Sequence, residues 1–146
     1  MIKSSMNRGF ALFTLLFALS AFFAAPPAYA EKIDIDLSRM SGTVVYAMVN
    51  QMVTEPQKFK GKIVNMSGVF SSYYDNETNQ RYFGCVISDA LACCSQGLAF
   101  ELKKPHKYPQ EYPDEGTEIT IRGIFDIRTE EDGVGFPVIR DAEMFR

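Results

Sequence analysis

The chain has 146 residues, with 15 Lys and Arg against 18 Asp and Glu, one His, three Cys and no Trp. This length is typical of one domain and excludes a large multidomain enzyme. The first thirty residues hold two basic side chains and no acid, so the remaining 116 residues carry a formal charge of −5 in place of −3. A domain of this charge is poorly suited to bind DNA or RNA through phosphates, because such binding needs clustered Lys and Arg.

Residues 1–30 have the pattern of an export signal peptide. Lys3 and Arg8 precede a largely apolar run of 15 residues, and the sequence Ala-Tyr-Ala at 28–30 has the small-x-small pattern that signal peptidase cleaves. The apolar run is shorter than the roughly 20 residues that a membrane-spanning helix needs. We therefore expect cleavage, no stable membrane insertion of the mature chain, and a location outside the cytoplasm, secreted or periplasmic. Disulfides are permitted there.

The mature chain is expected to begin with a polar lead-in and a short helix. Residues 31–40 form the lead-in, which three apolar side chains partly order: Ile33, Ile35 and Leu37. The remaining residues, 41–146, are expected to form one domain. Its helix is predicted by apolar side chains that recur at spacings of three and four: Val44, Val45, Met48, Met52 and Val53. Ser41 and Thr43 are candidate caps, and Pro56 ends or kinks the helix because it pushes the preceding residue out of the α region.

From Gly61 onward, alternating apolar and polar residues predict five β-strands. The first begins after Gly61. The other four span Arg81–Ser88, Gly97–Lys103, residues near 119–127 and Val134–Ile139. The first and fourth strands each carry a glycine at the same step of the apolar face, Gly68 and Gly123. Such a glycine marks a bulge or a sharp bend, and two bent strands suit neighbours in a small closed barrel. Pro137 marks the fifth strand as an edge or a barrel opening.

These elements predict a mainly β fold, a five-stranded OB-fold-like barrel preceded by one short helix. The segment 55–68, Glu-Pro-x-x-Phe-x-Gly-Lys-x-Val-x-x-x-Gly, resembles the entry to small exported bacterial OB-fold domains. The turn Ala-Cys-Cys-Ser-Gln-Gly at 92–97 resembles an uncharacterised family of secreted proteins in Gram-positive bacteria. It is also loosely similar to the extracytoplasmic domain of a permease family in those organisms. The resemblance implies a bacterial exported OB-fold protein, and a link to metal.

The three cysteines carry the sharpest chemical pattern in the sequence. Cys85 lies in the second expected strand, and Cys93 and Cys94 lie in the turn before the third. Three arrangements are open: a disulfide from Cys85 to Cys93 or Cys94, a Zn²⁺ site that uses Cys85, Cys93 and Cys94, or three free thiols packed as small apolar groups. The metal site lacks the usual C-x₂-C pair, and adjacent cysteines on extended backbone point to opposite sides. A vicinal disulfide would strain the peptide between the two cysteines.

Catalytic patterns are weak. A thiol-redox enzyme would want a C-x-x-C pair, and a cysteine hydrolase would want a histidine partner. His106, the single histidine, lies in a Pro-rich connection between the third and fourth strands. The acidic turn 130–132 lacks the spacing of an EF-hand. We therefore expect no enzymatic activity and no cofactor apart from the Zn²⁺ considered above.

The expected ligand face follows from the expected fold. OB-folds bind ligands on the face of strands two and three, which here carries Tyr73, Tyr74, Arg81 and Tyr82. Tyrosines stack on bases or sugars, while acids on the rim, Asp75, Glu77, Glu130 and Glu131, oppose a polyanion. The sequence thus predicts an exported, non-catalytic binding or accessory module for a protein, peptide or saccharide, and not for nucleic acid. The alternatives are an extracytoplasmic zinc-binding protein that uses the three cysteines and, less favoured, a thiol-redox protein.

Overall fold

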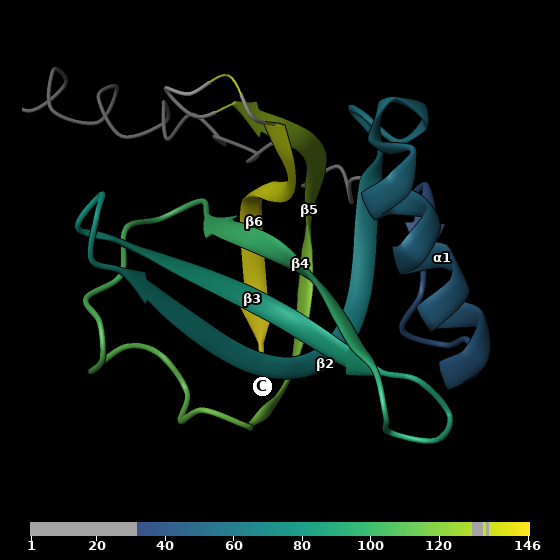
Figure 1. The fold of residues 1–146 in the computed structure, drawn as a ribbon, viewed down its shortest axis with the longest axis horizontal. Coiled ribbons are helices and arrows are strands. Elements are labelled where there is room, and N and C mark those ends of the chain that lie inside the picture. The colour runs from purple at the N-terminus through teal and green to yellow at the C-terminus, as the bar shows by residue number, and fades with distance from the viewer. Residues whose placement is uncertain (1–31, 130–132, 134) are drawn as a thin grey trace, which may run out of the picture. The chain divides into compact units, whose positions relative to one another are not determined.

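The structure of the protein is a computed structural model, which describes residues 32–129, 133 and 135–146. The expected signal peptide, the acids at 130–132 and Val134 lie outside the described residues. The elements in chain order are β1 (Ile35–Asp36), α1 (Gly42–Thr54), the 3₁₀ turn η1 (Pro56–Lys58), β2 (Ile63–Asp75), β3 (Gln80–Ser88), β4 (Ser95–Leu102), β5 (Glu118–Thr129) and β6 (Gly135–Phe145) (Figure 1). Within this part of the chain, no helix has the length and apolar character needed to cross a membrane.

Five strands form a ring. The strand order is β1-β2-β3-β4-β6-β5, and a further pairing between β2 and β5 closes the ring and leaves β1 outside it. The pairs β1–β2 and β4–β6 are parallel, and the other pairs are antiparallel. The predicted mainly β fold with one preceding helix is confirmed. A sixth, short strand was not expected.

The ring closes because β2 changes partner halfway along its length. Its first half, Ile63 to Val69, pairs with β5, and its second half, Val69 to Asp75, pairs with β3. Gly68 lies at the change of partner, where an added Cβ would be 2.6 Å from the carbonyl oxygen of Val86. Only glycine permits β2 and β3 to approach so closely.

The predicted bulge at Gly123 is confirmed. The register between β5 and β6 shifts across this residue, and a Cβ there would lie 2.6 Å from the carbonyl oxygen of Arg140. The end predicted for the fifth strand is wrong, because β6 continues beyond Ile139 to Phe145. Charged residues interrupt the apolar pattern in this extension, where Asp141 takes a positive φ of 50° beside the bulge.

The lead-in is more ordered than its sequence indicates. Ile35 and Asp36 form β1, which pairs with β2, and Leu37 is 1% exposed. The carboxylate of Asp36 accepts hydrogen bonds from Ser38 and from the amide of Asn65, and these bonds lower the pKa of Asp36. A strand of two residues is too short to produce an alternating pattern, which is why the sequence did not reveal it.

The helix begins and ends as predicted, but it buries a different stripe. Its N-cap is Ser41, and Glu55, before Pro56, leaves the α region. The buried residues are Val45, Val49 and Met52, whereas the predicted stripe included Val44 and Val53, which are exposed. A period of 3.6 residues passes through position 49 and places 44 and 53 on its flanks. The buried stripe packs on β3, β4 and β6.

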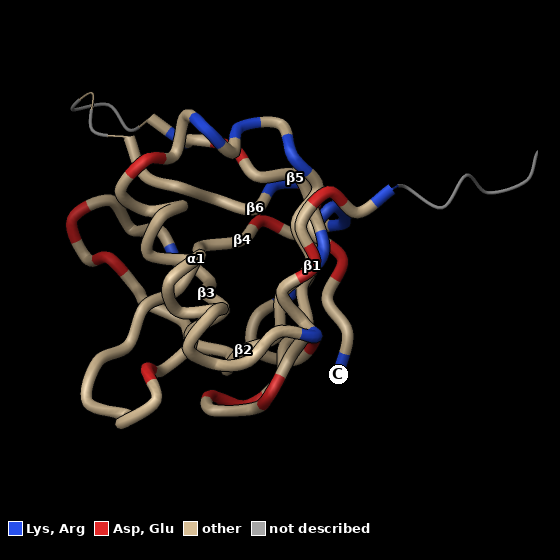
Figure 2. Tube along the Cα trace, turned by 90° about the vertical axis from the view of Figure 1, so that its right-hand side faces the viewer, with Lys and Arg blue, Asp and Glu red and all other residues tan. Residues whose placement is uncertain are grey.

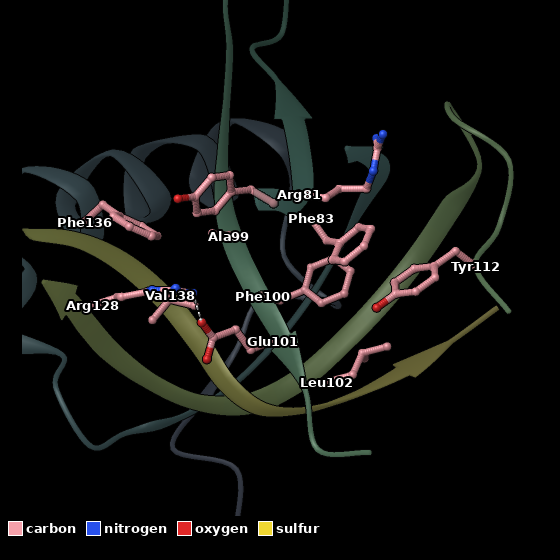
Figure 3. A pocket seen from close by; sticks show the side chains of 11 residues that line it. Arg81, Phe83, Ala99, Phe100, Glu101, Leu102, Tyr112, Arg128, Phe136 and Val138 are labelled. Atoms are coloured by element: carbon pink, nitrogen blue, oxygen red, sulfur yellow. Dashed lines mark hydrogen bonds and ion pairs between the residues drawn. The ribbon is translucent and has the colours of Figure 1, made fainter. Parts of the chain in front are cut away.

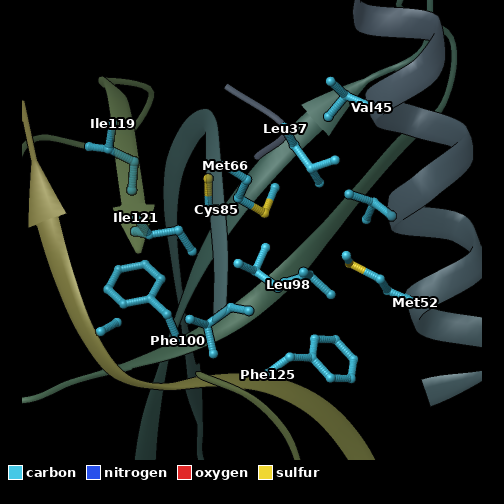
Figure 4. Close-up of a cluster of buried hydrophobic side chains, with 14 of the residues drawn as sticks. Leu37, Val45, Met52, Met66, Cys85, Leu98, Phe100, Ile119, Ile121 and Phe125 are labelled. Carbon is cyan, nitrogen blue, oxygen red and sulfur yellow. The ribbon is translucent and has the colours of Figure 1, made fainter. Parts of the chain in front are cut away.

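The core fills the interior of the ring and the space beneath α1 (Figure 4). Its largest members are three phenylalanines, Phe70, Phe100 and Phe125. Among the described residues, no polar or charged side chain is fully buried. Inward positions are therefore occupied by the core, and any ligand must bind on outward positions or loops.

Candidate functional site: an outer groove and a cysteine loop

A row of small side chains crosses the outer face of four strands. Ser71 of β2 pairs with Gly84 of β3, Gly84 pairs with Ala99 of β4, and Ala99 pairs with Val138 of β6. Residues in direct register point to the same face of a sheet. Because two members of this row carry no side chain beyond a methyl group, the backbone of β3 and β4 forms the floor of a shallow groove. We call this the outer groove.

Aromatic side chains form one wall of the outer groove. Tyr73 and Tyr82 lie directly opposite each other in register, two residues along from the pair Ser71 and Gly84 and so on the same face. Tyr73 is 67% exposed, so most of its ring is available to a ligand. The hollow beside it, of about 290 Å³, is lined by Ser71–Tyr73, Tyr82–Gly84, Val86 and Gly97–Ala99.

A second hollow, of about 200 Å³, adjoins the first and shares Tyr82, Phe83 and Ala99 with it (Figure 3). Phe136 packs edge-on against Tyr82, with ring centroids 5.9 Å apart. Arg128 lies over the same tyrosine ring and donates to Glu101 at 2.5 Å. These contacts hold Tyr82 in place and neutralise the charges at this end of the groove.

Charges along β5 and β6 are paired in the same way. Figure 2 shows basic and acidic residues interleaved on these strands. Arg122 pairs with Glu143 at 2.6 Å, and Arg140 pairs with Asp126 at 3.0 Å. This part of the surface therefore carries little net charge toward a ligand.

The structure separates the four residues predicted for the ligand face. Tyr73 and Tyr82 line the outer groove, while Tyr74 and Arg81, the next pair in register, point to the opposite face. Arg81 borders the second hollow, but its guanidinium stacks on Tyr74 at 5.3 Å and on Tyr108 at 4.2 Å. Arg81 and Tyr74 thus help to fix the connection between β4 and β5 rather than line the groove.

Sequence reasoning missed the floor of the groove and its far end. Gly84, Ala99, Phe136 and the pair of Arg128 with Glu101 were not singled out. One sequence feature pointed to the floor: positions 84, 97 and 99 are Gly, Gly and Ala at alternating places in otherwise bulky strands. The far end could not be found, because β4 and β6 are distant in sequence and pair only in the folded ring.

A larger hollow, of about 530 Å³, lies between the start of α1 and strands β2 and β3. Its lining combines aliphatic side chains with the backbone of several glycines and contains no aromatic ring. Glu118 is its one charged residue. It offers less for the recognition of a specific ligand than the outer groove does.

Cys85 is part of the core. It is fully buried in β3 (Figure 4), and burial raises the pKa of its thiol to about 12. Cys93 and Cys94 are exposed in the loop between β3 and β4, and all three cysteines, each within the described residues, carry free thiols. A disulfide from Cys85 to Cys93 or Cys94, one of the three arrangements that the sequence left open, is not formed, because the side chain of Cys85 points inward and the other two lie on the surface. The three thiols also do not form one cluster.

The loop of residues 89–94, which we call the cysteine loop, is organised by Asp89. One carboxylate oxygen of Asp89 accepts the backbone N–H groups of Cys93 at 2.9 Å and Cys94 at 3.4 Å. The other oxygen accepts the thiol of Cys93 at 3.0 Å. Ala92 takes a positive φ of 54°, so the backbone is not extended and the two neighbouring thiols lie together, 3.7 Å apart. The expectation that they point to opposite sides is wrong.

The electrostatics of the cysteine loop favour a protonated thiol at Cys93. The hydrogen bond from Cys93 lowers the pKa of Asp89, and the same bond raises the pKa of Cys93. A thiol-redox centre needs the opposite shift, toward the thiolate. His106 does not assist either, because its ring bonds to the carbonyl oxygen of Lys104 and it is not part of the Asp89–Cys93–Cys94 cluster.

No protein-family model matches the sequence, and no curated protein matches it significantly. The outer groove and the cysteine loop therefore carry the functional proposals.

Proposed function

We propose that the mature protein is an exported, non-catalytic binding module with an OB-fold-like barrel, which holds a saccharide in the outer groove. The strand order supports the barrel. Counted from β2, the five ring strands neighbour one another in the order 1-2-3-5-4-1, and the ring includes one sharply bent strand. In OB-folds the face of strands two and three binds oligonucleotides or oligosaccharides. Those strands correspond to β3 and β4, which form the floor of the groove.

One observation carries the proposal: a floor of Gly84 and Ala99 lies beside Tyr73 and Tyr82, which are paired in register on the same face. A floor without bulky side chains lets a flat ring approach the backbone, and the exposed ring of Tyr73 can stack on a sugar ring while its hydroxyl group offers a hydrogen bond. Ser71 adds a further hydroxyl group at the edge of the groove.

The charge of the protein favours a saccharide over a nucleic acid as the ligand. Two basic residues border the hollows: Arg128 is already paired with Glu101, and Arg81 stacks on Tyr74 and Tyr108. The formal charge of −5 beyond residue 30 repels a polyanion. An uncharged ligand with many hydroxyl groups needs no free basic side chain and is not repelled by the net negative charge.

The groove also lacks the residues of a glycoside hydrolase. Such enzymes use two carboxyl groups on either side of the scissile bond. Glu101 is the one carboxylate among the described residues that line the two hollows, and it is bound in an ion pair with Arg128. Binding without turnover is what this lining supports.

A glycan array followed by calorimetry tests the proposal on the secreted protein. We expect Tyr73→Ala to weaken saccharide binding about fivefold, which corresponds to a stacking contribution of about 1 kcal/mol. Gly84→Val should abolish binding, because the new side chain fills the floor. Tyr74→Ala is the matched control, since the neighbouring tyrosine points to the other face and should leave affinity unchanged.

Two results would overturn the proposal. One is that the wild-type protein binds no glycan. The other is that Tyr73→Ala and Tyr74→Ala weaken binding equally, which would place the ligand away from the outer groove. Selective capture of a peptide instead would replace the saccharide as the ligand class.

A further inference from the structure

We propose that the cysteine loop is a surface site for Zn²⁺, held by the carboxylate of Asp89 and the sulfur atoms of Cys93 and Cys94. This site is separate from the outer groove and does not depend on the function proposed for it. Its ligand set also differs from the one that the sequence suggested, because Cys85 is replaced by Asp89.

The positions of the donor atoms fit a tetrahedral zinc ion. One oxygen of Asp89 and the two sulfur atoms all lie within 4.8 Å of one another. With Zn–S bonds of about 2.3 Å and tetrahedral angles, two thiolates on one zinc ion are about 3.8 Å apart. The sulfur atoms of Cys93 and Cys94 are 3.7 Å apart. Two thiolates and a carboxylate are ligands that zinc commonly takes.

Hydrogen bonds to Asp89 hold the loop in this arrangement. Asp89 donates its backbone N–H to the carbonyl oxygen of Cys94 at 2.9 Å and accepts the N–H of Ala92 at its own carbonyl oxygen at 3.0 Å. Its carboxylate accepts the backbone N–H groups of both cysteines through one oxygen. The other oxygen, Oδ2, now accepts the thiol of Cys93 and is the atom available to an ion. Binding therefore requires little rearrangement of the backbone.

Binding exchanges protons for the ion. The thiols of Cys93 and Cys94 each release one proton to solvent, and the S–H hydrogen bond to Asp89 is replaced by metal–ligand bonds. The segment 86–98 contains no Lys or Arg that would repel the ion. Because the cysteines are exposed, the fourth position of the tetrahedron faces solvent. A site with three protein ligands and one open position suits a metal that is exchanged rather than one locked in a structural role.

The test is titration of the secreted, reduced protein with Cd²⁺, which reports thiolate ligation by an ultraviolet charge-transfer band, and then with Zn²⁺ in competition. We expect one Cd²⁺ per chain with a band of two thiolates, displaced by Zn²⁺ with submicromolar affinity. Cys93→Ser and Cys94→Ser should each halve the band and weaken binding at least tenfold. Asp89→Asn, which keeps an acceptor for the backbone N–H groups, should weaken binding severalfold.

Cys85→Ala is the matched control, because it removes the third thiol but no proposed ligand. It should leave both the stoichiometry and the band unchanged. Loss of the band in Cys85→Ala, or a full band in both Cys93→Ser and Cys94→Ser, would overturn the site. Absence of any Cd²⁺ band in the wild-type protein would overturn it as well. None of these results depends on glycan binding, so the two proposals fail independently.

Discussion

Cys85, Cys93 and Cys94 are the same residue type in two different environments, the core and an exposed loop. The side chain of Cys85 touches the bend of β2, where an added Cβ on Gly68 would lie 2.8 Å from its sulfur atom. It is fully buried, whereas the other two thiols are exposed on the cysteine loop. Cys85 is therefore part of the packed core, and of the three cysteines only Cys93 and Cys94 are accessible to a metal or a reagent.

The buried thiol predicts a loss of stability at alkaline pH. The pKa of Cys85 rises from 9.0 to about 12 on folding, so the unfolded chain loses this proton first. The stabilisation is complete below pH 9 and is lost as pH rises toward the folded pKa, by about 1.4 kcal/mol per pH unit. We expect the free energy of unfolding, measured in urea, to fall more steeply above pH 9 in the wild-type protein than in Cys85→Ala. Parallel pH profiles would contradict this.

Tyr73 and Tyr74 show how far single residues of a site can be predicted. The sequence predicts that tyrosines at the end of the first long strand face a ligand, and in the structure Tyr73 lines the outer groove. Alternation along the strand turns Tyr74 away, toward Arg81. Choosing between adjacent residues requires knowing which face of the strand is the outer one.

At the scale of the elements, α1 was recognised but its face was not. The apolar positions of the helix outnumber those that the sheet can cover, so spacing alone does not single out the buried stripe. Val49 is fully buried, while Val44 is 47% exposed. The contact with β3 and β4 decides between them.

This difference predicts unequal effects of the same substitution within one helix. Val49→Ala removes two buried methyl groups and leaves a cavity, so we expect it to lower the free energy of unfolding by about 2 kcal/mol. Val44→Ala should change it by less than about 0.5 kcal/mol, because the side chain is exposed and alanine favours helix. Urea denaturation of both variants provides the comparison. Equal losses would mean that α1 does not pack through Val49.

The cysteine loop is a second element whose geometry the sequence left open. The argument that adjacent cysteines point apart holds for extended backbone. Between β3 and β4 the chain turns through Ala92 at a positive φ, and Asp89 binds the turn from inside. The spacing of thiols along a sequence therefore says little about their distance when the loop conformation is unknown.

For the whole molecule, ring closure depends on the change of partner in β2. A side chain at Gly68 would meet the backbone of β3, where nothing can move aside. We expect Gly68→Ala to lower the free energy of unfolding by about 2 kcal/mol or more, as overpacking does. Gly84→Ala is the matched control, since its Cβ would find only ordinary contacts at 3.8 Å and beyond. Similar stabilities of the two variants would show that the close approach at Gly68 is not needed.

Local patterns in the sequence determined the mainly β class, the strands of the ring to within a few residues at most ends, the ends of α1 and the bulge at Gly123. These features depend on alternation, proline and glycine, which act over a few residues. The export signal peptide lies outside the described residues and stays a prediction.

Only the tertiary structure decided which strands pair, which side of each strand is outer, and where the thiols lie. The parallel contact of β4 with β6 brings Phe136 and Arg128 beside Tyr82, although they are more than forty residues apart in sequence. The same ring buries Cys85 and leaves Asp89 beside Cys93 and Cys94. Such contacts arise from pairing between distant strands and from loop conformation, and no periodicity in the sequence encodes either.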